Sequence, residues 1–386
     1  MFKFKIIPHT LHFKQPAGTS RGIYTERNVW YVELSDTEHP ARKGIGECAP
    51  LHDLSCDYTA DYGHILNTFA QQAEKELVMD AQGNVRLSPQ TTEDMRRFPS
   101  MLMGFETAVW HYSTGSQKLS HTAFASGKSG IRINGLVWMG TFEEMKARIE
   151  DKLEKGYKCV KLKIGAIDFD DELALLTMIR KHYSQDTVEL RVDANGAFRP
   201  GDDAEEKLRR LSRLDIHSIE QPIRAGNYEA MRQLCLHTPI PIALDEELIG
   251  INADCHNTSG GKPEMTKTEL LNHISPQYIV LKPSLHGGFH GAEEWIRHAE
   301  ARHIGWWVTS ALESNVGLNA IAHWCAMLHE GQSFTDISCS NSNVLLPQGL
   351  GTGQLFTDNI EGYPLEIRED KLWFDNNKHI DPQPRI

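Results

Sequence analysis

The chain contains the apolar run Val160-Lys161-Leu162-Lys163-Ile164-Gly165, in which two lysines lie two positions apart. Successive side chains of a β-strand point to opposite faces, so Lys161 and Lys163 share one face while the apolar residues occupy the other. Two ammonium groups side by side in an apolar strand need anions close to them. The run therefore predicts a strand that faces acidic side chains.

Acidic residues end three later apolar runs, and a further lysine, Lys282, ends a fourth. The acids are Asp193 after Leu190-Arg191-Val192, Glu220 after Ser218-Ile219, and Asp245 after Ile242-Ala243-Leu244. Lys163 and these acids recur at intervals of roughly 25 to 30 residues, which is about one strand and helix of a (β/α) barrel. In such a barrel the carboxyl ends of the strands form the catalytic face.

From residue 130 onward, short apolar strands alternate with amphipathic helices, and this alternation favours a parallel (β/α)8-type barrel over an open sheet. We expect strands near residues 131–138, 158–164, 188–193, 216–220, 240–245, 277–282, 305–310 and 335–339.

Outside the barrel, strands followed by helices predict an α+β capping domain at residues 1–125. The barrel would then span residues 126–345, and the tail, residues 346–386, would fold back on the capping domain. Residues 250–263 are rich in turn formers and predict a surface loop.

The composition limits the classes of partner. A formal charge of -12 without a basic run excludes a nucleic-acid or anionic-lipid surface. The 7 cysteines include no C-x-x-C pair, which argues against a disulfide framework or a zinc knuckle and for reduced thiols in the cytoplasm. Since no stretch approaches about 20 apolar residues, we expect a soluble protein without a membrane span. The oligomeric state cannot be read from the sequence.

Three carboxylates at three strand ends form an all-oxygen donor set, which suits Mg²⁺ better than zinc. The alternative is that each acid pairs with a lysine or caps a helix, but three acids on successive strands favour a metal site. A nearby divalent cation and a second ammonium would lower the pKa of Lys163 and make its amine available as a base. Such a site is suited to removing a proton next to a carboxylate.

Taken together, the lysine pair, the three acids and Lys282 resemble the enolase superfamily, in its muconate-lactonizing subgroup. Within that subgroup, residues 309–318 and 349–355 are most similar to the o-succinylbenzoate synthase family. The resemblance implies a modified (β/α)7β barrel, a capping-domain specificity loop at residues 44–51, and Mg²⁺, with Mn²⁺ as a substitute. It also implies a dehydratase of menaquinone synthesis that acts on a small carboxylate substrate.

The resemblance implies a role for each matching residue. Lys163 would remove the proton and then protonate the departing hydroxide, while Lys282 would stabilise the enolate from the opposite face. The metal ligands would be Asp193, Glu220 and Asp245, and the supporting residues Lys161, Asn195 and Glu246. Substrate contacts would come from Ser20 and Arg21 in a mobile loop, from Gly288, and from the backbone of Ser310, Ala311 and Leu312.

Two other functions fit the same residues. A racemase of N-acylamino acids would use Lys163 and Lys282 as bases on opposite faces, so the same lysines and acids would be required. A non-catalytic barrel that binds a carboxylate would need no base, and the presence of both lysines and all three acids counts against it.

Overall fold

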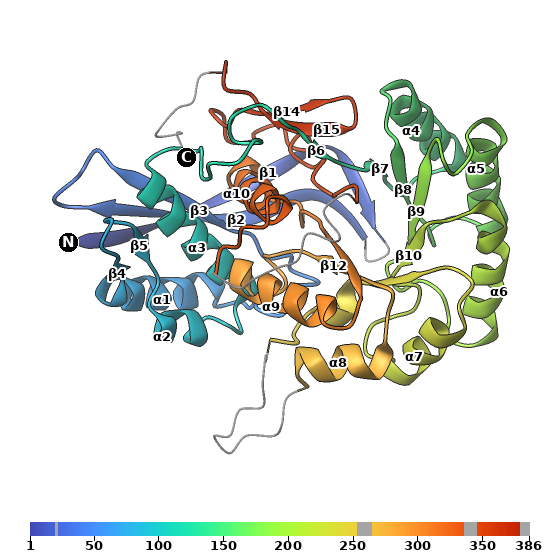
Figure 1. Cartoon of the computed structure of the whole chain (residues 1–386), viewed down its shortest axis with the longest axis horizontal. Helices are drawn as coiled ribbons and strands as arrows, with labels where there is room; N and C mark the ends of the chain where they lie inside the picture. Colours follow the sequence, from blue (N-terminus) through green and yellow to red (C-terminus); the bar gives the residue numbers. More distant parts are fainter. Residues whose placement is uncertain (20–21, 253–264, 336–345, 379–386) are drawn as a thin grey trace.

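The computed structural model describes residues 1–19, 22–252, 265–335 and 346–378 (Figure 1). The N-terminal part is a three-stranded antiparallel sheet in the order β1-β2-β3, followed by helices. Its main elements are β1 (Phe2–Thr19), β2 (Gly22–Asp36), β3 (Lys43–Cys48), α1 (Tyr62–Glu76), α2 (Pro89–Asp94) and α3 (Pro99–Thr114); a small hairpin, β4 (Val78–Met79) and β5 (Val85–Arg86), lies between α1 and α2.

Helix α3 packs closely on β3 because two glycines of the strand leave room for the helix backbone. A Cβ atom at Gly46 would lie 1.8 Å from the carbonyl oxygen of Gly104, and one at Gly44 would lie 2.0 Å from that of Ala108. The helix begins with Pro99 in its first turn and ends at Gly115, whose φ of 67° is left-handed. The close contact fixes the loop after β3, which reaches the mouth of the barrel.

The central part of the chain forms a parallel seven-stranded sheet in the order β13-β12-β11-β10-β9-β8-β7. Its strands are β7 (Gly135–Val137), β8 (Cys159–Lys163), β9 (Glu189–Asp193), β10 (Ser218–Glu220), β11 (Ile242–Leu244), β12 (Tyr278–Leu281) and β13 (Gly305–Val308). The helices that connect and follow them are α4 (Phe142–Glu154), α5 (Phe169–His182), α6 (Asp202–Leu211), α7 (Tyr228–His237), α8 (Lys267–Ile274), α9 (Gly288–Glu300) and α10 (Asn315–His329). In Figure 1, α4 to α7 cover the side of the barrel away from the capping domain.

The strand register aligns the charged residues at one end of the barrel. Lys163 of β8 pairs with Asp193 of β9, and Asp193 pairs in turn with Glu220 of β10. Because the pairing is in register at the strand ends, these side chains become neighbours although about 30 residues separate each from the next along the chain. The expected fold class, a barrel with an N-terminal α+β capping domain, is confirmed.

The last position of the barrel differs from the expectation. Most of the expected strand at 335–339 lies outside the described residues, and the gap between β13 and the first barrel segment is filled by Gln348 and Gly349. These residues form parallel bridges to Ile133 and Thr309 respectively. Gln348 and Gly349 thus lie beside barrel segments, although so short a bridged segment has no readable strand period, and the expected domain boundaries stay predictions.

The expected strand at 131–138 is also divided. Its first part, β6 (Ile131–Arg132), pairs antiparallel with β15 (Lys371–Phe374), which forms a hairpin with β14 (Leu365–Arg368). Only its second part, β7, belongs to the barrel. The tail also contacts the capping domain, where Phe356 bridges Phe13 of β1.

The loop expected at 250–263 lies largely outside the described residues. Among the helices that are described, none is long and apolar enough to cross a membrane. The cysteines of the described part that carry free thiols are Cys48, Cys56, Cys159, Cys235 and Cys325.

Candidate active site

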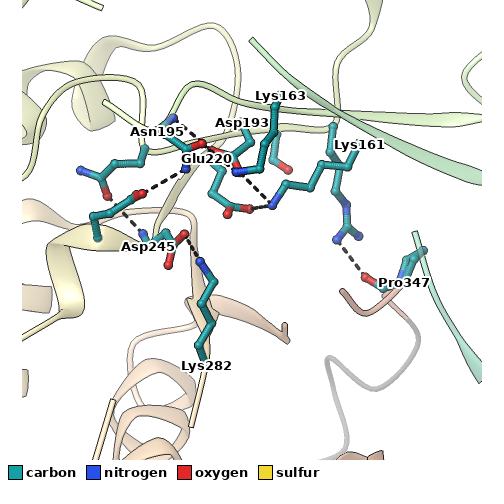
Figure 2. A network of polar contacts seen from close by, with 12 residues as sticks. Lys161, Lys163, Asp193, Asn195, Glu220, Asp245, Lys282 and Pro347 are labelled. Atoms are coloured by element: carbon teal, nitrogen blue, oxygen red, sulfur yellow. Dashed lines mark hydrogen bonds and ion pairs between the residues drawn. The ribbon is translucent and has the colours of Figure 1, made fainter. Parts of the chain in front are cut away.

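Strand β8 brings both of its lysines into contact with acidic side chains at the barrel mouth (Figure 2). The ammonium nitrogen of Lys161 lies 2.5 Å from Glu220 Oε2 and 3.2 Å from Asp193 Oδ2. The ammonium nitrogen of Lys163 lies 3.2 Å from Asp193 Oδ2 and donates a hydrogen bond to Asn195 Oδ1 at 2.7 Å. The period-two pattern thus places both lysines on one face, with Asp193 between their ammonium groups.

The turn after β8 is held by contacts that fix the position of Lys163. Gly165 has a φ of 99°, and a Cβ atom there would lie 2.4 Å from the Cβ of Ala197, so the turn requires glycine. The backbone amides of Gly165 and Ala166 donate to Glu172 Oε1 at 2.5 and 3.2 Å. Glu172 belongs to α5, so the helix anchors the end of the strand that carries the lysine.

Lys282, directly after β12, approaches the acids from the opposite side and pairs with Asp245, which follows β11. Figure 2 shows Asp193, Glu220 and Asp245 between the lysine pair of β8 and Lys282. Each of the three acids thus pairs with at least one lysine, which is the contact pattern expected from the alternative to a metal site.

Burial and neighbouring charges shift the pKa values of the three acids in different directions. Burial raises the pKa of Glu220 to about 8, and repulsion from Asp193 adds to the rise. Burial also opposes ionisation of Asp193, but Lys161 and Lys163 hold its pKa well below the usual range. For Asp245 the burial effect is likewise outweighed, because Lys282 lowers the pKa. The site therefore needs further positive charge if all three acids are to ionise.

Two oxygens in this group, Glu220 Oε1 and Asp245 Oδ1, have no hydrogen-bond partner among the residues that the structure describes. A buried carboxylate oxygen without a partner is unfavourable, and hard divalent cations prefer oxygen ligands. The donor chemistry of Asp193, Glu220 and Asp245 therefore fits Mg²⁺ or Mn²⁺. In the part of the chain that the structure describes, no three acidic, histidine or cysteine side chains already converge as a metal-binding group.

Two further polar residues support the acids. Asn195 has a left-handed φ of 44°, accepts from Lys163 and donates to Glu246 Oε1 at 3.0 Å. Gln221, which the sequence reasoning missed, has a buried side-chain oxygen that accepts from the backbone amide of Asp245 at 3.1 Å. This bond fixes the backbone that carries the third carboxylate.

The side chains of Lys161, Lys163, Asp193, Glu220 and Lys282 line a cavity whose other walls are largely apolar. The capping domain contributes Tyr24, Leu51 and Leu54, and the first barrel segment contributes Asn134, Leu136 and Trp138. The turn after β12 contributes Leu285, and the last two segments contribute Thr309, Ser310, Ala311, Leu312, Gly349, Gly351 and Thr352.

The sequence reasoning gave no site role to the wall at Asn134, Leu136 and Trp138. The signal was present, because these residues alternate along one expected strand and must share a face. Trp138 also lies near the expected base, since the Lys163 ammonium is 5.6 Å from the centre of its ring. The same periodicity argument that selected the lysines would have selected these residues.

The expected substrate contacts of the turn after β13 lie at the cavity. Ser310, Ala311 and Leu312 line the cavity, but their backbone amides are already occupied: they donate to Gly349 O, Glu313 Oε2 and Ser310 Oγ at 3.0, 2.7 and 3.1 Å. The turn thus uses these donors internally, and the expectation that they hold a substrate carboxylate stays a prediction.

Gly288 is another expected substrate contact, and that role stays a prediction. It is absent from the cavity lining and begins α9 with a φ of 68°, where a Cβ atom would lie 2.3 Å from Glu106 Oε2. Its small size thus serves domain packing. Ser20 and Arg21, the remaining expected contacts, lie outside the described residues.

Comparison with known proteins places this site in a family. A model of the family described as "Enolase C-terminal domain-like" matches residues 144–257. The chain is 42% identical over 373 residues to the o-succinylbenzoate synthase of Desulfotalea psychrophila, covering 91% of this chain and 93% of the relative. It is 31% identical to the L-Ala-D/L-Glu epimerase of Bacillus subtilis, but only over 48% of this chain and 47% of that one.

Solved structures of similar proteins support the same family. The crystal structure of MenC from Desulfotalea psychrophila has a TM-score of 0.75 and 36% identity, covering 96% of this chain and 99% of that one. The muconate lactonizing enzyme of Pseudomonas fluorescens, a likeness in fold alone, has a TM-score of 0.74 at 20% identity, covering 100% of this chain and 96% of that one. The chain belongs to the enolase superfamily, whose enzymes use a divalent metal ion, typically Mg²⁺. Within it, the chain belongs to the o-succinylbenzoate synthase family.

Proposed function

We propose that this chain catalyses the Mg²⁺-dependent syn dehydration of 2-succinyl-6-hydroxy-2,4-cyclohexadiene-1-carboxylate to 2-succinylbenzoate, a step of menaquinone biosynthesis. The observation that carries the proposal is the placement of Lys163 and Lys282 on opposite sides of one cavity, with three buried acids between them. Its support from relatives is the 42% identity to an o-succinylbenzoate synthase along nearly the whole of both chains.

In this proposal Lys163 acts twice. Its neutral amine removes the proton from ring carbon 1, next to the carboxylate, and the resulting ammonium then protonates the hydroxyl on carbon 6. The carbon–oxygen bond breaks, water leaves, and the ring becomes aromatic while Lys163 returns to the amine. Because one residue handles both the proton and the leaving group, both must depart from the same face of the ring.

The other charged residues stabilise the negative charge that develops on the substrate. Asp193, Glu220 and Asp245 would hold the divalent ion, which supplies positive charge to the substrate carboxylate. Lys282, a fixed ammonium on the opposite face, stabilises the same charge. The walls around Leu51 and Trp138 exclude water and orient the ring.

The second candidate function is racemisation of N-acylamino acids, and the position of Lys282 favours it, because a second lysine on the opposite face could serve as a second base. Lys282→Arg separates the two functions. Arginine keeps the charge but does not shuttle protons, so a dehydratase should retain measurable turnover and a racemase should lose all of it.

The deciding experiment combines purified protein, Mg²⁺ and the cyclohexadiene and follows formation of the aromatic product by absorbance. In parallel, an N-succinylamino acid is incubated with the protein in D₂O, and loss of optical rotation and exchange of the α-proton are measured. We expect kcat/KM for aromatisation to exceed that for racemisation. The reverse order would establish the racemase instead.

A further inference from the structure

Arg27 is a buried cation of the capping domain that binds two backbone carbonyls on different loops. It lies on β2 and is 4% exposed. Its guanidinium donates one hydrogen bond to the carbonyl oxygen of Ala49, just after β3, and another to that of Ala311, just after β13. One side chain of the capping domain therefore joins a loop of its own domain to a turn of the barrel.

Both loops line the active-site cavity. Leu51 and Leu54 follow Ala49 in the capping-domain loop, and Ala311 itself and Leu312 line the cavity from the barrel side. The distance between these two walls limits how large a group can lie between them. Since Arg27 binds a carbonyl of each loop, it controls the separation of the walls without contacting the cavity itself.

The barrel turn is in a conformation that needs such support. Leu312 has a φ of 68°, in the left-handed region that residues with a Cβ atom rarely adopt. Such a conformation persists only where the surrounding contacts hold it. Glu313 accepts from the Ala311 amide and from Ser310 Oγ, at 2.7 and 2.6 Å, so the amide side of the turn is fixed from within. Arg27 fixes its carbonyl side.

The surroundings of Arg27 also balance its charge. Burial lowers the pKa of the guanidinium, but the carboxylates of Glu313 and Glu47 oppose that effect. Glu47 of β3 in turn accepts from the amides of Ser314 and Gly317 at the start of α10, at 2.9 and 2.8 Å. The cation thus lies within a rigid, fully enclosed group of residues from both domains.

We propose that Arg27 is a positioning residue that sets the spacing of the two cavity walls, and thereby determines which acyl or ring substituents the enzyme accepts. The assignment rests on the proposed function, because it concerns the same cavity. It depends on the planar fork of arginine, whose separate N–H groups reach two carbonyls at once, whereas a lysine ammonium is a single point.

The chain offers a matched control. Arg42 binds two consecutive carbonyls, donating from Nε to Tyr112 O at 2.6 Å and from Nη2 to Ser113 O. Both acceptors belong to α3 of the capping domain, and neither lines the cavity. Arg42→Lys therefore removes the same kind of contact without touching the walls of the site.

The test compares wild type, Arg27→Lys and Arg42→Lys. We expect Arg27→Lys to raise KM for the cyclohexadiene about tenfold, the equivalent of losing one hydrogen bond to a charged group, with a smaller change in kcat. Its kcat/KM ratio for cyclohexadiene over an N-succinylamino acid should fall, because looser walls discriminate less. Hydrogen exchange should become faster in peptides covering residues 49–54 and 310–314. Arg42→Lys should change none of these quantities by more than about twofold.

Unchanged KM, discrimination and loop exchange in Arg27→Lys would overturn the assignment, and so would equal changes in both variants. Arg27→Met provides the stronger perturbation, and if it fails to fold, the lysine variant still decides. A wild type without dehydratase activity would overturn the proposed function instead. Faster exchange confined to the two loops would then still support the positioning role.

Discussion

Among the described residues, the active-site cavity and the contact with α9 are two of the regions where buried charged side chains lie between the capping domain and the barrel. At α9, both oxygens of Glu294 have partners: Oε1 accepts from Arg96 at 2.9 Å, and Oε2 accepts from Arg96 at 2.6 Å and also from Lys267. In the acidic group at the cavity, Glu220 and Asp245 each keep one oxygen without a partner in the described part of the chain.

This difference in hydrogen-bond partners distinguishes buried charges that only hold the domains together from buried charges that can bind a ligand. Where every atom of a buried ion pair is satisfied, the group holds two surfaces together and leaves nothing to bind a ligand. Where buried carboxylates retain unsatisfied oxygens beside a cavity, the fold leaves them available for a cation and a substrate. Glu294 and Glu220 are both buried glutamates paired with a lysine, yet only Glu220 lines the cavity.

Replacing the active-site lysine should have the largest effect. Lys163→Ala removes the group that takes the proton from ring carbon 1 and then protonates the leaving hydroxyl, so we expect kcat to fall by at least about 10³-fold. Lys267→Ala is the matched variant at α9, where a buried lysine, 1% exposed, that does not line the cavity is removed. Folded Lys267→Ala protein should keep its kcat but melt at a lower temperature. Equal losses of kcat in the two variants would contradict the distinction between the regions.

Removing the metal tests the unsatisfied oxygens. EDTA should abolish turnover, and Mg²⁺ or Mn²⁺ should restore it. In Glu220→Gln, titration calorimetry should show weaker Mg²⁺ binding, while circular dichroism shows an unchanged fold. Full activity after thorough chelation would argue against metal ligation by these acids.

The satisfied pair at α9 should affect stability instead. Glu294→Gln leaves Lys267 buried without its opposing charge, while Arg96 keeps its ion pair with Glu93, and we expect a loss of about 3 kcal/mol in the free energy of unfolding. Urea denaturation measures this loss, and steady-state kinetics on the folded protein should show kcat within about twofold of wild type. A variant as stable as wild type would show that the pair contributes little to domain docking.

The pH dependence of stability tests another buried carboxylate where the capping domain meets α9, that of Glu106. Burial raises the pKa of Glu106 to about 8, although its carboxylate accepts from the backbone amides of Phe289 and His290. Its ordinary pKa is near 4.5, so between these values the native state holds a proton that the unfolded state has released. Stability attributable to Glu106 should therefore fall as pH rises through this window and level off above it.

Glu106→Gln should remove that dependence. Melting temperatures at pH 5.5 and 8.5 give the measurement, and the wild type should lose stability relative to the variant between the two values, by at most about 1.4 kcal/mol per pH unit for one proton. A wild type that gains relative stability with rising pH would show that the two amide contacts dominate over burial.

Much of the site could be predicted because its residues follow local rules. A period of two places Lys161 and Lys163 on one face, and the carboxyl ends of parallel strands meet at one edge, so Asp193 and Glu220 had to become neighbours. The wall at Trp138 follows the same period, so its position at the site could also have been predicted from the sequence. The internal hydrogen bonds of the turn after β13 could not be predicted in this way, because no local sequence pattern shows that Glu313 accepts from the Ala311 amide.

The sequence by itself determined the strand order, the class of barrel and the face that carries the charges, because these depend on periodicity and on residue types at strand ends. Only the tertiary structure decided how the barrel closes at Gln348 and Gly349, and which loop each capping-domain side chain reaches. Arg27 and Ala311 are separated by 284 positions, and their contact depends on how the two domains pack. No local pattern encodes such a contact, because its geometry exists only once both domains have folded and docked.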